Sequence, residues 1–217
     1  MIRGILWDLD GVIADTETYH FQAMQQAMAS FGYRAPHDVI QRLFGTTTEK
    51  IITAILPRDV DSGIIAEIIR AHSRFFCENI AGKVVVFAGV RRCLEMFASK
   101  GMLQAIASSS TSDIIESIVD ELESHGYFQT LVSGAELPPK PDAAVFRKAA
   151  TALGLAEGEC VVIEDSPMGI ASAHAAGMRV IAVATSRAKD ALVEADICVD
   201  RLDDLPEDIL DQINNIS

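Results

Sequence analysis

The sequence predicts an α/β fold: a Rossmann-like parallel sheet core with helices on both faces, plus an inserted all-helical cap. Three observations predict it. From about residue 103 onward, short apolar segments alternate with segments of helical pattern. The apolar segments are continuous rather than mixed with polar residues, which is typical of parallel strands buried on both faces. Residues 15 to about 82, in contrast, contain helical patterns throughout.

Composition indicates an ordinary globular protein. The chain has 217 residues, of which 49% are hydrophobic and 23% charged, and its formal net charge is -13. This length is enough to bury a substantial core. The negative charge argues against nucleic acid or an anionic membrane as a partner. No stretch reaches the about 20 apolar residues of a membrane span, and the first residues lack a signal-peptide pattern.

The first apolar segment ends in two carboxylates. Residues 5–12 read ILWDLDGV, so that Asp8 and Asp10 stand one residue apart just before Gly11. Strand interiors disfavour aspartate, and a buried carboxylate is costly unless it is paired or binds a metal. We therefore predict that the first strand ends at Asp8 to Asp10 and that these groups serve chemistry rather than folding.

Helical patterns follow this strand. Residues 16–31 form an amphipathic stretch that Gly32 closes, and residues 47–56 and 61–76 carry isoleucine pairs at helical spacing. Asp61 is a suitable residue to start the last of these helices.

The helical segment divides the chain into two parts. We expect residues 1–14 and 84–217 to form the catalytic core and residues 15–83 to form the cap. Hinges should lie near residues 14–16 and 82–84. Ligands of open α/β sheets bind outside the carboxyl ends of the strands, so the cap should lie over that edge.

The rest of the chain alternates between strands and helices. Expected strands cover 103–107, 131–133, 160–163, 179–183 and 197–199, and expected helices cover 112–123, 142–153 and 166–176. Ser166, the proline that follows it, and Gly177 are typical start and end residues for the last helix.

Four polar groups fall at strand ends or just before a helix. They are Asp8 with Asp10, Ser108 with Ser109 and Ser110, Lys140, and Glu164 with Asp165. Each group alone has a structural explanation, such as a loop serine or the start of a helix. Because parallel strands end at one edge of the sheet, we expect all four groups to converge there.

Together these groups resemble the motifs of the haloacid dehalogenase superfamily. The first motif is matched by Asp8-Leu-Asp10-Gly-Val12, the second by Ser108, the third by Lys140, and the fourth by Glu164-Asp165-Ser-Pro-Met-Gly169-Ile. The resemblance covers essentially the whole chain, cap included. It points to the branch that contains β-phosphoglucomutase and many small-molecule phosphatases, and residues 15–21 are especially similar to the mutase segment.

The resemblance implies a role for each group. Phosphate monoesters hydrolyse very slowly in water, and a carboxylate nucleophile splits the reaction into two easier steps. Asp8 would be that nucleophile, while Asp10 would protonate the leaving oxygen and later deprotonate a water. We expect the acidic surroundings to raise the pKa of Asp10 for the first task. Lys140 would neutralise the transferring group, and Ser108 with the Ser109 amide would hydrogen-bond a phosphoryl oxygen.

A divalent cation would offset the repulsion between these carboxylates and a phosphate. Mg²⁺ prefers about six oxygen ligands. The resemblance implies that the Asp8 and Asp165 carboxylates and the Asp10 carbonyl bind Mg²⁺, with Glu164 as a further candidate ligand. Gly11 would allow the backbone to approach the phosphate closely.

Some cap positions depart from the mutase pattern. A mutase needs a basic site for a second phosphate, but the cap loop after Gly45 reads Thr-Thr-Thr-Glu where the pattern has an arginine. The pattern's lysine after the second-motif serines is Thr111 here. The other side chains that could supply this positive charge are Arg42, Lys50, His72 and Arg74.

Three further residues have open roles. His20 and Thr48 are candidate substrate-contacting residues of the cap. After Lys140 the second proline of the family pattern is lost, which leaves the role of Asp142 open.

We therefore expect a Mg²⁺-dependent phosphatase that hydrolyses a small phosphorylated metabolite, a sugar phosphate above all, through an aspartyl phosphate. The alternative is a hexose-phosphate mutase of the β-phosphoglucomutase type, and a third reading is a non-catalytic phosphometabolite-binding protein. We also expect a cytoplasmic monomer whose four cysteines are reduced, because their spacing forms no paired motif.

Overall fold

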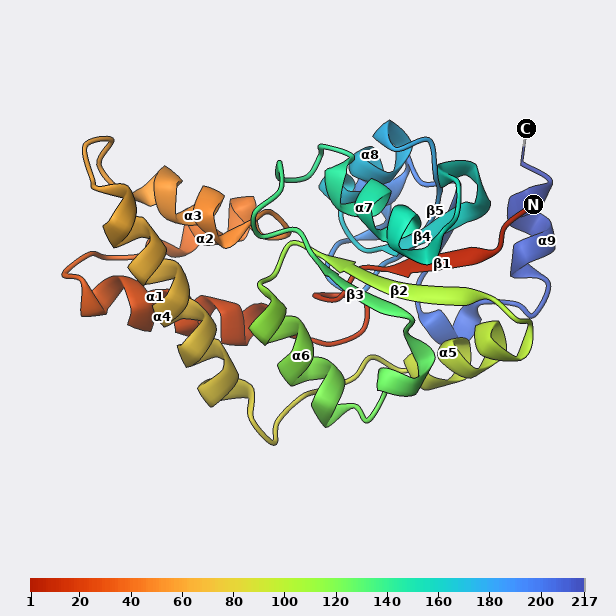
Figure 1. The fold of residues 1–217 in the computed structure, drawn as a ribbon, viewed down its shortest axis with the longest axis horizontal. Coiled ribbons are helices and arrows are strands. Elements are labelled where there is room, and N and C mark those ends of the chain that lie inside the picture. The colour runs from red at the N-terminus through yellow and green to blue at the C-terminus, as the bar shows by residue number, and fades with distance from the viewer. Residues whose placement is uncertain (217) are drawn as a thin grey trace.

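The structure is a computed structural model that describes residues 1–216. Within them, a six-stranded parallel sheet carries helices on both faces, and a group of four helices lies beside it (Figure 1). The strands are β1 Gly4–Trp7, β2 Leu103–Ser108, β3 Thr130–Ser133, β4 Cys160–Glu164, β5 Arg179–Val183 and β6 Ile197–Val199. Their order in the sheet is β3-β2-β1-β4-β5-β6. The predicted fold class is confirmed.

Alternate residues of each strand face opposite layers of helices. In β1, Ile5 and Trp7 belong to one apolar cluster and Leu6 to the other, and all three are fully buried. The first cluster includes α5 Val90–Ser99, α6 Ser112–Glu121 and α9 Ile209–Asn214, and the second α7 Ala144–Leu153 and α8 Pro167–Ala175. Burial on both faces explains why the strands are continuously apolar.

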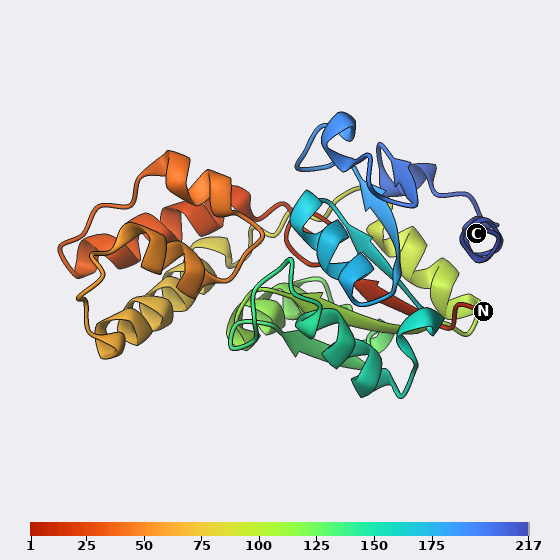
Figure 2. The same ribbon diagram turned by 90° about the horizontal axis from the view of Figure 1, so that it is seen from above.

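The remaining four helices have an apolar core of their own. They are α1 Glu17–Ser30, α2 His37–Leu43, α3 Thr48–Ile55 and α4 Ser62–Ile80. Met24, Met28, Ile52 and Ile68 lie at the centre of that core. Figures 1 and 2 both show this group beyond the edge of the sheet at which β1 ends. The helical segment thus lies where the sequence predicts a cap, while its exact domain boundaries stay a prediction.

Side-chain caps start several helices at the predicted places. The Asp61 carboxylate accepts a hydrogen bond from the Gly63 amide at 2.7 Å at the start of α4. The Ser166 hydroxyl accepts one from the Gly169 amide at 3.1 Å at the start of α8. These bonds satisfy amide groups that the first turn of a helix leaves unpaired.

Some boundaries differ from the sequence-based expectation. The strand β1 ends at Trp7, so Asp8 and Asp10 lie in the turn after it rather than at its end. Helices α2 and α5 have no individual counterpart among the predicted helices. Four short 3-10 helices complete the described elements: η1 His125–Tyr127, η2 Glu157–Glu159, η3 Lys189–Leu192 and η4 Leu202–Asp204.

The strand order reverses next to β1, and this reversal determines where a ligand site is expected. The chain passes from β1 to β2 and β3 on one side, then returns to β4 on the other. The Asp8 amide donates to the Ile163 carbonyl at 3.0 Å, which continues the β1–β4 pairing past the end of β1. The turn after β1 and the turn after β4 therefore meet at the reversal, the usual position of a ligand site in such sheets.

Two other expectations concern the whole chain. All four cysteines are free thiols, and Cys93 and Cys160 are buried. Within residues 1–216, each helix is either too short or too polar to cross a membrane.

Candidate active site

Asp8 and Lys140 form a buried ion pair at the strand reversal. The Lys140 ammonium donates to Asp8 Oδ1 at 2.7 Å and to Glu164 Oε1 at 2.6 Å. Lys140 is 2% exposed and Glu164 is 1% exposed. Burial alone would lower the pKa of Lys140, but the two carboxylates outweigh it and raise that pKa above its ordinary value. Lys140 is therefore a permanent cation shared by two carboxylates.

Glu164, the last residue of β4, is held by the start of α8. Its Oε2 accepts hydrogen bonds from the amides of Asp165 and Ser166, each at 2.8 Å, and from the Ser166 hydroxyl at 2.9 Å. A side chain at Gly169 would collide with the Glu164 carboxylate. Both carboxylate oxygens are thus occupied, and Glu164 is oriented toward Lys140.

Asp165 lies against the turn that follows β1. The Ser186 hydroxyl donates to its Oδ2. Gly11 has a φ of 89°, and a Cβ there would overlap the Asp165 carboxylate. Gly11 is therefore required both by its backbone conformation and by the close approach of Asp165.

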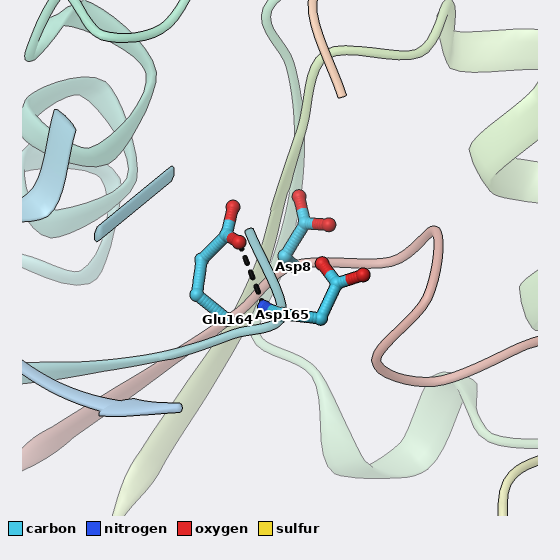
Figure 3. Close-up of side chains that lie close together, drawn as sticks. All are labelled: Asp8, Glu164 and Asp165. Carbon is cyan, nitrogen blue, oxygen red and sulfur yellow. Dashed lines mark hydrogen bonds between the residues drawn. The ribbon is translucent and has the colours of Figure 1, made fainter. Parts of the chain in front are cut away.

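Asp8, Glu164 and Asp165 form a buried acidic cluster. Each offers a carboxylate oxygen, and these atoms lie within 4.8 Å of one another. Figure 3 shows the Asp8 and Asp165 carboxylates side by side, with Glu164 bound to the Asp165 amide. Burial, Glu164 and Asp10 raise the pKa of Asp8 to about 7, against the effect of Lys140. Burial and the Glu164 and Asp8 charges also raise the pKa of Asp165 well above its ordinary value.

This cluster fits a divalent cation. One ammonium faces three carboxylates, so the site holds an excess of negative charge that burial makes costly. The donors are oxygens, the ligands that hard cations such as Mg²⁺ prefer. Asp8 and Asp165 are the better candidates, because both oxygens of Glu164 are already hydrogen-bonded.

Asp10 is surrounded by hydrogen-bond donors. Its Oδ1 accepts from the Thr16 hydroxyl at 2.6 Å and lies 2.9 Å from His20 Nε2. Its Oδ2 accepts from the Ser110 hydroxyl at 2.8 Å and from the Ser108 hydroxyl at 3.3 Å. Burial would raise the pKa of Asp10, but His20 and the hydroxyl groups outweigh it and lower that pKa. The expected raised pKa is therefore wrong for this arrangement, because donors rather than carboxylates surround Asp10.

The serines after β2 link the core to the cap. The Ser108 hydroxyl accepts from the Ser110 amide at 3.0 Å, which fixes the turn. The Ser109 hydroxyl donates to the Gly45 carbonyl of the cap at 3.0 Å. Ser110 was predicted to lie at this edge of the sheet but was given no role, and Thr16, which stands at the start of the cap, was not predicted as a site residue.

A partly open cavity of about 30 Å³ lies between the cap and these serines. It is lined by Asp8, Asp10, His20, Met24, Ile40, Phe44, Gly45, Thr46, Thr48, Ile51, His72, Ser108, Ser109 and Ser110. A volume of this size accommodates one or two water molecules. The predicted cap residues His20 and Thr48 therefore face the same space as the predicted catalytic carboxylates.

His20 connects Asp10 to a second histidine of the cap. The rings of His20 and His72 stack with centroids 5.4 Å apart, and His20 Nδ1 lies 3.4 Å from His72 Nε2. His72 is 2% exposed, and its Nδ1 has no hydrogen-bond partner among the described residues. Burial, with the charge of His20, lowers the pKa of His72 to about 3, so its imidazole is neutral near pH 7.

The other candidate cap cations lie elsewhere. Among Arg42, Lys50, His72 and Arg74, only His72 lines this cavity. Arg42 lines a separate cleft, and Arg74 is an exposed neighbour of Glu78.

Thr111 and Asp142 have structural contacts. The Thr111 hydroxyl lies 2.9 Å from the Ser73 hydroxyl of the cap. Asp142 is exposed and accepts a hydrogen bond from the Ala144 amide at 2.9 Å, at the start of α7.

Comparison with known proteins identifies the family. Residues 5–183 match the family model described as haloacid dehalogenase-like hydrolase. The chain belongs to this family. The predicted membership is thereby confirmed, and the chain is an enzyme of the hydrolase class.

Individual relatives agree with this assignment. The chain is 31% identical to Protein CbbY of Rhodobacter capsulatus over 194 residues, which cover 83% of this chain and 84% of that protein. It is 26% identical to the phosphorylated carbohydrates phosphatase of Thermotoga maritima over 182 residues, 82% of each chain. The fold is similar to that of β-phosphoglucomutase from Clostridium difficile, with a TM-score of 0.87, 22% identity and coverage of 99% and 98% of the two chains.

Proposed function

We propose that this protein is a Mg²⁺-dependent phosphatase that hydrolyses a small phosphorylated metabolite, such as a sugar phosphate, through an aspartyl phosphate on Asp8. The observation that carries this proposal is that Asp8, which is paired with Lys140, and Asp10 line one cavity between the cap and the core. Homologous proteins named as phosphatases of phosphorylated carbohydrates support the substrate class.

In the first step, an Asp8 oxygen attacks the phosphorus, and the bond from phosphorus to the leaving oxygen breaks. Lys140 offsets the charge on Asp8 and on the transferring group. Ser108, with the Ser109 amide, would donate to a phosphoryl oxygen. Asp10 supplies the proton to the leaving oxygen, for which it must first be protonated, so its hydrogen bonds must rearrange when substrate enters.

In the second step, a water oxygen attacks the phosphorus of the aspartyl phosphate. Asp10 accepts the proton of that water, a task that suits a carboxylate whose pKa is lowered. The bond between the Asp8 oxygen and phosphorus then breaks, which releases inorganic phosphate and restores the Asp8 carboxylate.

Asp8, Asp165 and the Asp10 carbonyl would hold the Mg²⁺ ion, and Glu164 would orient Lys140. The bound ion supplies electrostatic stabilisation of charge on the transferring phosphoryl group. The negative excess of the buried acidic cluster supports this assignment.

The cap favours a phosphatase over the mutase alternative. A mutase must hold a second phosphate, yet the cap loop after Gly45 has threonines where the mutase pattern has an arginine, and the Thr111 hydroxyl pairs with Ser73. We also propose the predicted cap boundaries of 15–83, a monomeric state and a cytoplasmic location as parts of this account.

Phosphate release from a panel of sugar phosphates and other small phosphomonoesters tests the proposal. With Mg²⁺, wild-type protein should release phosphate, chelation should stop release, and added Mg²⁺ should restore it. Asp8→Asn should lower kcat by about 10⁴-fold or more, since the nucleophile is lost. Asp190→Asn, which changes an exposed carboxylate away from the site, is the matched control and should retain activity.

Two results would contradict the proposal. One is turnover by Asp8→Asn at the wild-type rate. The other is isomerisation of a sugar phosphate without net phosphate release, enhanced by a trace of bisphosphate, which would identify a mutase.

A further inference from the structure

Part of the lining of the active-site cavity is apolar. Met24, Ile40, Phe44 and Ile51 of the cap line this space. These side chains come from α1, α2, the segment that follows α2, and α3, so three helices contribute to the apolar wall. Such a surface suits the C–H groups of a ligand and gives no compensation to a charged one.

Apart from His20, whose Nε2 lies 2.9 Å from Asp10 Oδ1, the polar groups of the cap in this cavity are uncharged. They are the hydroxyls of Thr46 and Thr48 and the imidazole of His72, which lie beside His20. The Thr46 hydroxyl already donates to the Leu43 carbonyl at 2.7 Å, which leaves its oxygen as an acceptor. His72 Nδ1 is a further hydrogen-bonding atom without a partner in residues 1–216. Neutral acceptors and donors of this kind match hydroxyl groups of a ligand.

Apart from His20, which is paired with Asp10, the described cap residues that line the cavity include no cationic side chain. None of the described residues that line it is a lysine or an arginine. His72 does not take this role near pH 7, because burial keeps its imidazole neutral. A second phosphate or a carboxylate placed here would lose its hydration without gaining a counter-charge, which is strongly unfavourable.

We propose that the substrate is the phosphate monoester of a small neutral alcohol, which presents hydroxyl and C–H groups to the cap and carries no second phosphate or carboxylate. This inference rests on the proposed phosphatase function and specifies its substrate class. The cap would recognise the leaving alcohol through the apolar wall and through Thr46, Thr48 and His72.

Matched pairs of esters test the inference on wild-type protein with Mg²⁺. Glycerol 3-phosphate is compared with 3-phosphoglycerate, glucose 6-phosphate with 6-phosphogluconate, and fructose 6-phosphate with fructose 1,6-bisphosphate. In each pair, we expect the ester whose alcohol part is uncharged to have a kcat/KM at least about tenfold higher than that of the other ester. Equal values, or a preference for the carboxylate or bisphosphate member, would overturn the inference and leave the phosphatase function standing.

A cap variant tests the physical cause. Thr48→Lys places a cation in the cavity, and Thr48→Gln is the uncharged control of similar length. The ratio of interest in each pair is kcat/KM for the ester of the uncharged alcohol divided by kcat/KM for its charged partner. Thr48→Lys should lower this ratio, while Thr48→Gln should leave it near the wild-type value. An equal change in both variants would contradict the electrostatic cause. If Thr48→Lys does not fold, as judged by its melting temperature, the wild-type ratios alone decide.

The two proposals fail in different ways. Absence of phosphate release from every ester, neutral or charged, would remove the phosphatase function and this inference with it. Phosphate release from the carboxylate or bisphosphate esters in preference to the esters of uncharged alcohols would contradict only the inferred substrate class.

Discussion

At the scale of single residues, the site contains buried charged side chains that folding stability alone does not explain. Asp8, Lys140 and Glu164 are all buried, and a buried ion pair gives little net stability after its desolvation cost. Two carboxylates share one ammonium, and Asp165 adds a third carboxylate nearby. This arrangement is explained by its chemistry, because it prepares a nucleophile and a cation site.

His72 gives a prediction about pH and stability. In the unfolded chain its pKa is near the ordinary 6.5, whereas in the folded protein it is about 3. Between these values the unfolded state binds more protons, so the free energy of unfolding falls as the pH is lowered from about 6.5 toward 3. Denaturant unfolding measured across this window should show a weaker pH dependence in His72→Gln than in wild type.

The matched control for this measurement is the exposed His37 on α2. His37→Gln should keep the wild-type pH dependence. If His72→Gln and wild type lose stability in parallel as the pH falls, the neutral buried state of His72 is wrong.

The sequence allows the reacting residues to be predicted, but not how they are held. Asp8, Lys140 and Asp165 follow from motifs at strand ends. The partners of Asp10 cannot be predicted from motifs, because the contacts of His20 and Thr16 with Asp10 depend on how the cap packs against the core. The pKa of Asp10 was predicted in the wrong direction for the same reason.

At the scale of elements, strands were easier to predict than the shorter helices. The continuous apolar segments were sufficient for the strands, since burial on both faces leaves a simple pattern. Helix α2 has only seven residues, and its N-cap Pro36 makes no side-chain hydrogen bond to the helix. Helix α5 follows Gly89, whose φ is 90°, so it too lacks a capping side chain. Its apolar residues Val90, Cys93, Leu94 and Phe97 do have helical spacing, and that pattern could have revealed it.

The start of α8 gives a prediction at this scale. Gly169→Ala would gain about 1 kcal/mol from helix propensity. The new methyl group would, however, collide with the Glu164 carboxylate, which four hydrogen bonds hold in place. Overpacking of this kind costs about 1–3 kcal/mol. We therefore expect a lower melting temperature and a lower kcat, because Glu164 would no longer orient Lys140.

Gly158→Ala is the control for that variant. A Cβ at Gly158 has no heavy atom within 4 Å among the described residues, so stability and activity should stay near wild type. A Gly169→Ala protein as stable and active as Gly158→Ala would show that the Glu164 position is not constrained as described.

At the scale of the whole molecule, the cap and the core enclose the site. The cavity of about 30 Å³ is smaller than a sugar phosphate, so we expect the cap to move when substrate enters. Hydrogen bonds from Ser109 to Gly45 and between Ser73 and Thr111 join the two parts in the closed arrangement.

A disulfide across this contact tests the required movement. The Ser73 and Thr111 hydroxyl oxygens are 2.9 Å apart, so the two side chains meet across the contact between cap and core. The double variant Ser73→Cys, Thr111→Cys should lose activity when oxidised and regain it on reduction. Ser73→Cys alone, treated in the same way, controls for oxidation of the native cysteines. Full activity of the oxidised, cross-linked protein would show that the cap need not open.

The nucleophilic role of Asp8 is the central claim, and trapping the intermediate tests it most directly. The best ester of the substrate panel, carrying labelled phosphate, is mixed with the protein and Mg²⁺, the reaction is quenched during turnover, and the labelled residue is located. The account predicts label on Asp8 that hydroxylamine releases, and no label in Asp8→Asn. Label on another residue, or phosphate release by Asp8→Asn at the wild-type rate, would contradict it.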